Sequence, residues 1–291
     1  MADASESRTA GGAPGPDTRR GAAFRLDGVS VAYRTNGGSL TAVEAVDAAV
    51  KPGQFISLVG PSGCGKSTIL KVIAGLVAPS TGIVSVDGQP LTGPYQGMGI
   101  VFQEALLLDW RTVLGNVLLQ ADVRRMARAD LEPRARDLLS RVGLGEFLDR
   151  RPYELSGGMR QRVAICRALV HNPSLLLMDE PFGALDAMTR EQMNEDLQRL
   201  WLDLGMTAFF VTHSIPEAAL LSDRVLVMSA RPGRLLDDVD IDLPRPRTLR
   251  SLHGQPRYLE YVAEIRETLD QGAAEPPGPP LGRPHNPKDL R

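Results

Sequence analysis

The sequence predicts an α/β fold: a parallel-sheet core, an antiparallel β portion and an inserted helical subdomain. Three observations predict it. An apolar run over residues 55–59 ends directly at a glycine-rich turn, as a buried parallel strand does. After Pro173, short apolar runs alternate with helical patterns, which is typical of a parallel sheet. Between these two parts, residues from about 104 to 170 show mainly helical periodicity.

Composition limits the class of protein. The chain has 291 residues, 43% of them hydrophobic, which is enough for one large core or two smaller ones. Its net charge of −2 gives no basic bias towards nucleic acid. No signal peptide and no run of about 20 apolar residues is present, so we expect a soluble protein or one held at a membrane by another component. Cys64 and Cys166 form no disulfide framework, which favours a reducing cytoplasm.

The composition also divides the chain into four parts. Residues 1–21 are rich in Ala, Gly, Ser and Arg without periodicity, and we expect a disordered arm. One ordered domain is predicted over residues 22–243. Residues 244–270 read as a proline-broken linker followed by an amphipathic helix, which predicts a helical extension. Residues 271–291 are rich in Pro and Gly and are expected to form a disordered tail.

The elements follow from hydrophobic periodicity, in chain order. Loose alternation predicts strands over residues 24–33 and 42–50. Further strands are predicted over residues 55–59, 83–86, 99–102, 174–178, 207–212 and 224–228. Helices are predicted over residues 66–76, 112–120, 130–142, 158–170, 187–204 and 215–221.

A phosphate-binding loop connects the strand over residues 55–59 to the next helix. It comprises Gly60, Pro61, Ser62, Gly63, Cys64, Gly65, Lys66, Ser67 and Thr68. The spacing G-x-x-x-x-G-K-S matches the Walker A pattern, which occurs by chance in roughly one chain in a hundred of this length. Glycines let the backbone N–H groups surround phosphates, and the helix N-terminus adds positive potential. We expect Lys66 to reach the β- and γ-phosphates and Ser67 to ligate Mg²⁺; the strand and helix around the loop disfavour an ordinary glycine-rich turn.

Four apolar residues followed by two acids form the sequence from Leu175 to Glu180. Asp179 is expected at the strand end, facing Mg²⁺ directly or through water. Glu180 is expected to polarise a water that attacks the γ-phosphate. The alternative is a strand followed by a solvated acidic turn, which would be preferred if the phosphate loop were absent.

Between these motifs lies a second glycine-rich turn, Leu155-Ser156-Gly157-Gly158-Met159. It resembles the LSGGQ signature of ATP-binding cassette (ABC) ATPases, with Met replacing the final Gln, and the resemblance covers roughly residues 24–235. The resemblance implies a RecA-like P-loop core, ATP and Mg²⁺ as cofactors, and a homodimer or a pair with a similar ATPase subunit, because one subunit's signature caps the ATP held by the other. A serine N-cap would explain the helix start alone but not the whole pentapeptide.

Four further positions follow from the resemblance. Gln103 resembles the Q-loop glutamine that senses Mg²⁺ and the attacking water, and Asp186 resembles the D-loop aspartate of the dimer seam. His213 resembles the switch histidine near the γ-phosphate, and it follows a predicted strand, where α/β ligands bind. Tyr33 lies at about the spacing of the A-loop aromatic and would stack on adenine, worth about 1–3 kcal/mol by analogy with other base–aromatic contacts. The alternatives are a surface glutamine, a helix N-cap, a structural histidine and an edge-strand tyrosine.

Residues 104–112 resemble the segment that follows the Q-loop in nitrate, sulfonate and taurine importers, and residues 177–186 and 229–234 match the same branch. Importers of bicarbonate and pyrimidine-type precursors belong to the same group. Asp109 departs from the usual proline. Residues 105–110 are expected either to form a groove for a partner helix or to pack within the insertion.

The resemblance therefore implies the ATP-hydrolysing subunit of an importer on the cytoplasmic side of the bacterial inner membrane. Its expected partners are two transmembrane permease subunits and, indirectly, a periplasmic or extracellular solute-binding protein, without nucleic acid. An ATP-gated clamp of DNA repair or ribosomes is the main alternative, and the single compact cassette without heptads disfavours it. A P-loop kinase is a second alternative, which needs neither a signature nor a D-loop.

Overall fold

The computed structural model describes residues 21–35 and 38–274. The predicted arm, apart from Gly21, and residues 275–291 of the predicted tail lie outside the described residues. Residues 271–274 belong to the last helix, which ends at Ala274, beyond the predicted end at residue 270.

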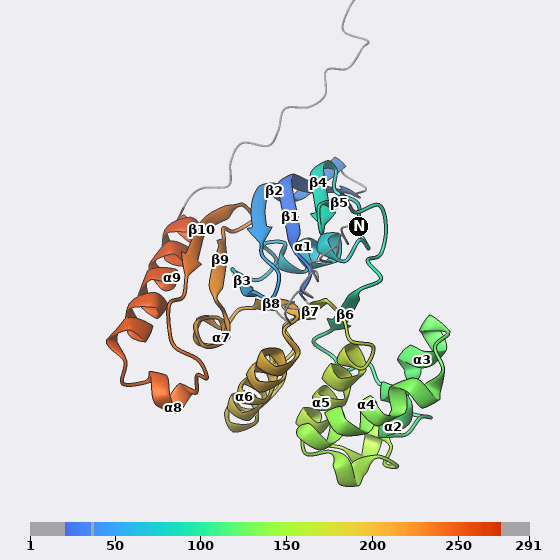
Figure 1. The fold of residues 1–291 in the computed structure, drawn as a ribbon. Helices are drawn as coiled ribbons and strands as arrows, with labels where there is room; N and C mark the ends of the chain where they lie inside the picture. The colour runs from blue at the N-terminus through green and yellow to red at the C-terminus, as the bar shows by residue number, and fades with distance from the viewer. Residues whose placement is uncertain (1–20, 36–37, 275–291) are drawn as a thin grey trace, which may run out of the picture.

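A four-stranded antiparallel sheet opens the described chain, with the order β2-β1-β4-β5 (Figure 1). Its strands are β1 (Phe24–Thr35), β2 (Gly38–Val50), β4 (Thr81–Val86) and β5 (Gln89–Pro90). β1 pairs antiparallel with both β2 and β4, which confirms the predicted antiparallel portion. The sequence analysis missed β5 because two residues are too few to show a hydrophobic period.

A six-stranded sheet of order β10-β9-β3-β8-β7-β6 forms the centre of the molecule. Its strands are β3 (Phe55–Val59), β6 (Met98–Val101), β7 (Leu175–Asp179), β8 (Thr207–Thr212), β9 (Arg224–Met228) and β10 (Leu235–Asp240). Five strands pair in parallel, as predicted, and β10 is added antiparallel at the edge. β10 was missed because its aspartates interrupt the apolar pattern.

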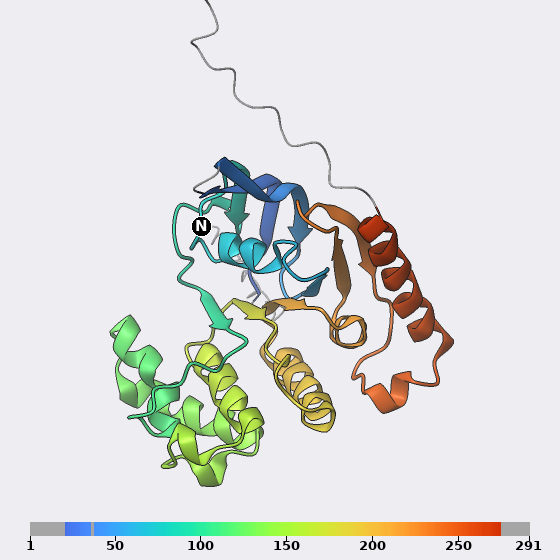
Figure 2. The ribbon, with the colours of Figure 1, turned by 180° about the vertical axis from the view of Figure 1, so that it is seen from behind.

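Two hydrophobic cores lie on opposite faces of this sheet, and successive residues of one strand enter different cores. Leu175 and Leu177 pack with α1 (Lys66–Ile73) and the antiparallel sheet. Leu176 and Met178 pack with α5 (Gly157–Leu169) and α6 (Ala187–Leu204). The strands thus lie between layers, as the views from both sides show (Figures 1 and 2). Their carboxyl ends therefore converge at one edge, which positions the site.

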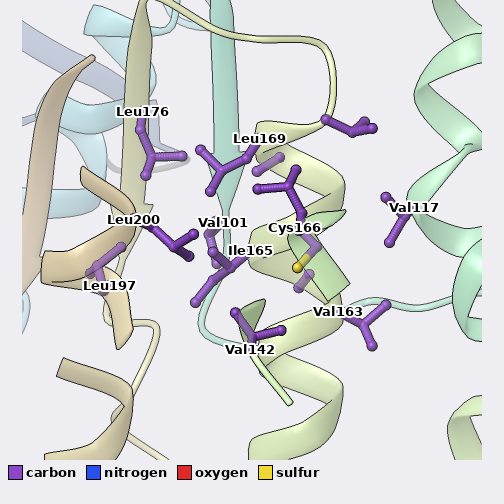
Figure 3. Packing of buried hydrophobic residues seen from close by; sticks show 14 of the residues in the cluster. Val101, Val117, Val142, Val163, Ile165, Cys166, Leu169, Leu176, Leu197 and Leu200 are labelled. Carbon is purple, nitrogen blue, oxygen red and sulfur yellow. The ribbon is translucent and has the colours of Figure 1, made fainter. Parts of the chain in front are cut away.

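The helical insertion contains α2 (Val113–Val117), α3 (Leu119–Arg124), α4 (Arg128–Arg141) and α5, with two short 3₁₀ turns. The single helix predicted over residues 112–120 is instead divided at Leu118 between α2 and α3. α5 joins the insertion to the sheet. Ile165 and Leu169 of α5 pack beside Val101 and Leu176 of the strands, while Val117 faces α5 from the insertion (Figure 3).

The C-terminal extension consists of α8 (Leu249–Leu252) and α9 (Pro256–Ala274). Tyr258, Tyr261 and Ile265 of α9 pack in a third hydrophobic cluster with α7 (Ile215–Leu221) and β9. In the linker, the buried Arg247 donates hydrogen bonds to carbonyls at the end of α7. Across residues 21–35 and 38–274, no helix has both the length and the apolar character that crossing a membrane requires.

Candidate nucleotide-binding and hydrolysis site

The phosphate loop lies between β3 and α1, as predicted. Gly63 and Gly65 have positive φ angles of 76° and 109°, which other residues adopt only with strain. A Cβ added at Gly65 would lie 2.6 Å from Val43 Cγ2 and 2.9 Å from Ala42 O. The loop therefore needs glycine here both for its turn and for its close approach to β2.

Lys66 is buried inside this loop, with 5% of its surface exposed. Its Nζ donates hydrogen bonds to Gly60 O at 2.8 Å and Pro61 O at 3.1 Å. The same ammonium lies 3.8 Å from Glu180 Oε1. The backbone thus holds a positive charge at the centre of the loop, between the phosphate-facing N–H groups and the acid predicted to activate water.

Ser67 and Asp179 form a second pair at the same edge. Ser67 Oγ donates a hydrogen bond of 3.0 Å to Asp179 Oδ1. Burial raises the pKa of Asp179, and the bond from Ser67 partly opposes that rise. Within the described ranges, His, Cys, Asp and Glu side chains form no group of three or more that could hold a metal. A single hydroxyl beside a single carboxylate suits Mg²⁺, which is bound through few protein oxygens together with substrate phosphates.

Glu180 and His213 meet across adjacent strand ends. Glu180 follows β7 with a φ of 44°, an uncommon conformation for a non-glycine residue, and its N–H donates to Val211 O of β8. His213 follows β8, and its Nδ1 lies 3.0 Å from Glu180 Oε2. The turn at Glu180 thus places its carboxylate between the His213 imidazole and the Lys66 ammonium. Unusual backbone conformations of this kind tend to concentrate at functional sites.

A pocket of about 260 Å³ is lined by Lys66, Ser67 and Glu180, whereas Asp179 and His213 contact these residues from outside its lining. Its lining residues are Tyr33, Leu40, Ala42, Ser62, Gly63, Gly65, Lys66, Ser67, Thr68, Glu180 and Arg231. Tyr33 and Leu40 are paired in register on β1 and β2, and the Tyr33 hydroxyl lies 3.3 Å from Thr68 Oγ1. An aromatic and an aliphatic side chain therefore stand next to the phosphate loop, as a platform for a base requires.

Sequence analysis missed three of these lining residues, Leu40, Ala42 and Arg231. Arg231 Nε and Nη2 donate to Gly63 O at 3.1 and 2.9 Å. The turn between β9 and β10 brings it there, and Gly233 of that turn packs so closely that an added Cβ would lie 2.0 Å from Cys64 O. No local spacing reveals this contact. The signal for Leu40 was the hairpin register, which places it opposite Tyr33.

Gly60, Pro61, Asp179 and His213 do not line this pocket, and neither do Gln103 and Cys64. Gln103 lines a second pocket of about 430 Å³ together with Leu106, Leu107 and Gly157. Its role towards Mg²⁺ and the attacking water stays a prediction. The Cys64 side chain is 1% exposed and packs in the core with Met228, and burial raises the pKa of its thiol. Only the backbone of Cys64 is therefore available to a phosphate.

The signature turn lies at the start of α5. Ser156 Oγ accepts a hydrogen bond of 3.3 Å from Met159 N, so this serine is a helix N-cap. Ser156 and Gly157 are exposed, whereas Gly158 packs against Thr189 of α6. Asp186 is likewise exposed and caps α6 through Thr189 N at 3.0 Å. None of the signature residues or Asp186 lines the phosphate pocket of the described chain.

The fold and this pocket define a P-loop nucleotide-binding cassette. The sequence profile described as "ABC transporter" matches residues 43–183. An ABC transporter ATP-binding protein of Methanocaldococcus jannaschii is 43% identical over 84% of this chain and 91% of its own length. A taurine import ATP-binding protein of Burkholderia thailandensis is 44% identical over 83% of this chain and 94% of its length. The chain therefore belongs to the ABC transporter ATP-binding family.

A nitrate import ATP-binding protein of Synechococcus elongatus is 44% identical over 81% of this chain, but the match spans only 36% of that protein. Among solved structures, the dimeric bacterial ABC transporter cassette MJ0796 has a TM-score of 0.67 and 32% identity, covering 76% of this chain and 100% of that one. The same cassette is known in a dimeric post-hydrolysis state with ADP and phosphate. The predicted fold class and the predicted ATPase activity are thereby confirmed.

Proposed function

We propose that this chain powers the import of a small solute of the taurine, sulfonate, nitrate or bicarbonate type. The importer ATPase is favoured over a non-transport clamp because the similar proteins are import subunits. Taurine, nitrate and bicarbonate import proteins are equally similar, at 44% identity, which supports a small solute that carries an anionic group. A pyrimidine-type precursor is the remaining alternative.

One observation carries the proposed mechanism: the two glycine-rich turns face different surroundings. Lys66, Ser67 and Glu180 converge on one pocket, whereas Ser156 and Gly157 are exposed and line none of it. A helix N-terminus with exposed N–H groups attracts an anion, and this one is free of acidic residues in its first turn. We infer a head-to-tail dimer in which the signature turn of each copy closes over the ATP of the other.

In that dimer, Lys66 and the loop N–H groups stabilise charge on the β- and γ-phosphates. Glu180 accepts the proton of the attacking water, and His213 holds its carboxylate in place through the 3.0 Å contact. Tyr33 and Leu40 contact the base, and Arg231 adds positive charge at the edge of the loop. Mg²⁺, held by Ser67 and Asp179 with Gln103 as a further predicted ligand, would neutralise charge on the phosphates.

The second pocket is the proposed permease groove. Leu106 and Trp110 beside it are 57% and 71% exposed, which suits a partner helix better than internal packing. α5 links this groove to the signature, because Arg167 donates to Ala105 O and Leu106 O and Gln161 donates to Phe102 O. Movement of the groove would therefore move the helix that begins at Ser156.

Two transmembrane permease subunits would thus hold the ATPase dimer at the cytoplasmic face of the bacterial inner membrane. A solute-binding protein outside the membrane would reach this chain only through them. The pair of cassettes is two copies of this chain or one copy with a similar subunit.

Mixing two inactive variants tests the shared site. Lys66→Ala removes the phosphate-loop charge, and Gly157→Asp places a negative charge at the signature, next to the phosphates of the other copy. A mixed dimer then contains one intact composite site. Equal mixing should restore about a quarter of the wild-type rate, because half of random dimers are mixed and each has one complete site. A mixture that stays as inactive as its components, with mixed dimers shown by affinity tags, contradicts the proposal.

A further inference from the structure

Behind the catalytic pocket, the segments that carry Glu180 and His213 are joined a second time. Arg190 lies in the first turns of α6 and Glu217 in the first turn of α7. Arg190 Nε lies 3.6 Å from Glu217 Oε1, and the glutamate side chain is only 8% exposed. These two residues take no part in the motifs recognised from the sequence.

Arg190 fixes the turn that follows Glu180. Its Nη2 donates to Leu185 O at 2.7 Å, and its Nε donates to Phe182 O at 3.3 Å. These two carbonyls belong to the stretch between Glu180 and Asp186. The rigid fork of one guanidinium therefore holds both ends of the short connection from the water-activating acid to the D-loop.

Glu217 fixes the segment around the switch histidine in the same way. Thr212 Oγ1 donates to Glu217 Oε2 at 2.8 Å, and the same hydroxyl accepts the N–H of Ser214 at 3.0 Å. Thr212, before His213, thus bonds the carboxylate directly, and Ser214, after His213, is connected to it through the Thr212 hydroxyl. Burial raises the pKa of Glu217, and the bond from Thr212 and the charge of Arg190 favour its ionised form.

We propose that Arg190 and Glu217 are positioning residues that hold the D-loop segment and the switch-histidine segment in one fixed relation. Their contact closes a ring whose other closure is the 3.0 Å contact between Glu180 and His213. The ring keeps that catalytic contact in place when the second copy presses on Asp186. The proposal rests on the proposed role of Glu180 and His213 in hydrolysis.

The test is a double-mutant cycle on the full chain, with Arg190→Gln, Glu217→Gln and the double variant. Each single variant should lower kcat about 10- to 100-fold, as misplacement of catalytic groups by about 1 Å does. The KM for ATP should stay within about twofold, because the phosphate loop is untouched. The double variant should be no slower than the slower single variant, because both changes break one link.

The matched control is the ion pair between Arg162 of α5 and Asp196 of α6, at 2.9 Å with 21% and 11% exposure. Arg162→Gln removes a comparably buried pair that does not contact either catalytic segment. Arg162→Gln should lower the melting temperature about as much as Arg190→Gln does, while leaving kcat within about twofold of the wild-type value. An equal loss of kcat in this control, or additive losses in the cycle, overturns the positioning role.

Arg190→Lys keeps the test decisive if the glutamine variants do not fold. Lysine retains the charge opposite Glu217 but cannot donate to two carbonyls as a fork. We expect Arg190→Lys to have a kcat below that of the wild type but still measurable. A wild-type kcat together with a wild-type melting temperature overturns the proposal. Glu180→Gln in the same assay tests the site itself: if it hydrolyses ATP normally, the proposed function fails whatever the cycle shows.

Discussion

Two glycine-rich turns in this molecule lead into helices, and they differ in what surrounds them. The phosphate loop before α1 is enclosed by its own chain, with Asp179, Glu180 and Arg231 drawn to it from distant segments. The signature turn before α5 has its serine cap and a hydrogen bond from Arg160 to Leu155 O, and its Ser156 and Gly157 are exposed. The glycine-rich turn before α1 thus forms a complete site within the chain, whereas the one before α5 does not.

The difference has a topological cause. The loop follows β3 in the middle of a parallel sheet, so the segments after β7 and β8 bring Glu180 and His213 towards it. The signature turn follows a 3₁₀ turn within the helical insertion, and the strand that ends near it is β6, where Gln161 donates to Phe102 O. The pocket beside the signature turn contains neither the phosphate loop nor Glu180, which supports the proposed pairing with a second copy.

The largest effect is expected from Glu180→Gln, which changes the phosphate-loop site. The variant keeps the shape of the side chain but cannot accept a proton, so phosphate release should fall about 10²- to 10⁴-fold. ATP should still bind, because Lys66 and the loop N–H groups are unchanged. The measurement is phosphate release at saturating ATP, with fluorescent-nucleotide binding as the control; hydrolysis at the wild-type rate would remove Glu180 from its role.

Much of the phosphate-loop region could be placed from the sequence, because its motifs are local. Walker A spacing, the apolar strand before Asp179 and the strand before His213 are local signals, and each side chain lies where a parallel sheet places it. Apart from β5 and the division between α2 and α3, the strands and helices from Phe55 to Met228 were found for the same reason, with boundaries shifted by one to three residues at α1, β4 and α4.

What the sequence could not supply is long-range. Arg231 reaches Gly63 through a turn 168 residues away, and β10 is a strand only because it pairs with β9. The direction of the Cys64 side chain was also invisible, since a motif shows that a residue belongs to the loop but not which face it occupies. Its thiol lies in the core, so we expect slow alkylation rather than nucleotide-dependent labelling.

Intermediate effects are expected from variants of the two signature glycines, Gly157 and Gly158, which differ in their surroundings. A Cβ at Gly157 would meet only Leu185 Cδ2, at 3.9 Å, so Gly157→Ala should leave stability unchanged or slightly raised. The methyl group would instead face the nucleotide of the other copy, and turnover should fall about tenfold.

Gly158→Ala is the contrasting variant. Its Cβ would lie 2.6 Å from Thr189 Cγ2, so α5 and α6 must move apart, which should cost about 1–3 kcal/mol of unfolding free energy. Urea unfolding and ATPase rate, measured on both variants, should show one functional and one structural defect. Normal turnover of Gly157→Ala at all protein concentrations would mean that no second copy approaches this turn.

The smallest effect concerns the far end of the signature helix. His171 follows α5, its Nε2 contacts Met98 O at 3.0 Å, and burial is the main cause that lowers its pKa to about 4. In the unfolded chain the pKa of His171 is near 6.5, so a fall in pH protonates the unfolded chain before the folded one. The contribution of neutral His171 to the unfolding free energy is therefore complete above about pH 6.5 and is lost as the pH falls towards 4.

Partial exposure limits that contribution to at most about 2 kcal/mol. His171→Asn should therefore reduce the difference in unfolding free energy between pH 7.5 and pH 5 by about 1–2 kcal/mol. Because His171 is attached to α5 and not to the phosphate loop, acid should weaken the signature half first. ATP binding to folded protein at pH 5 should then persist while turnover falls, and an equal loss of both would show that the two halves respond to acid as one unit.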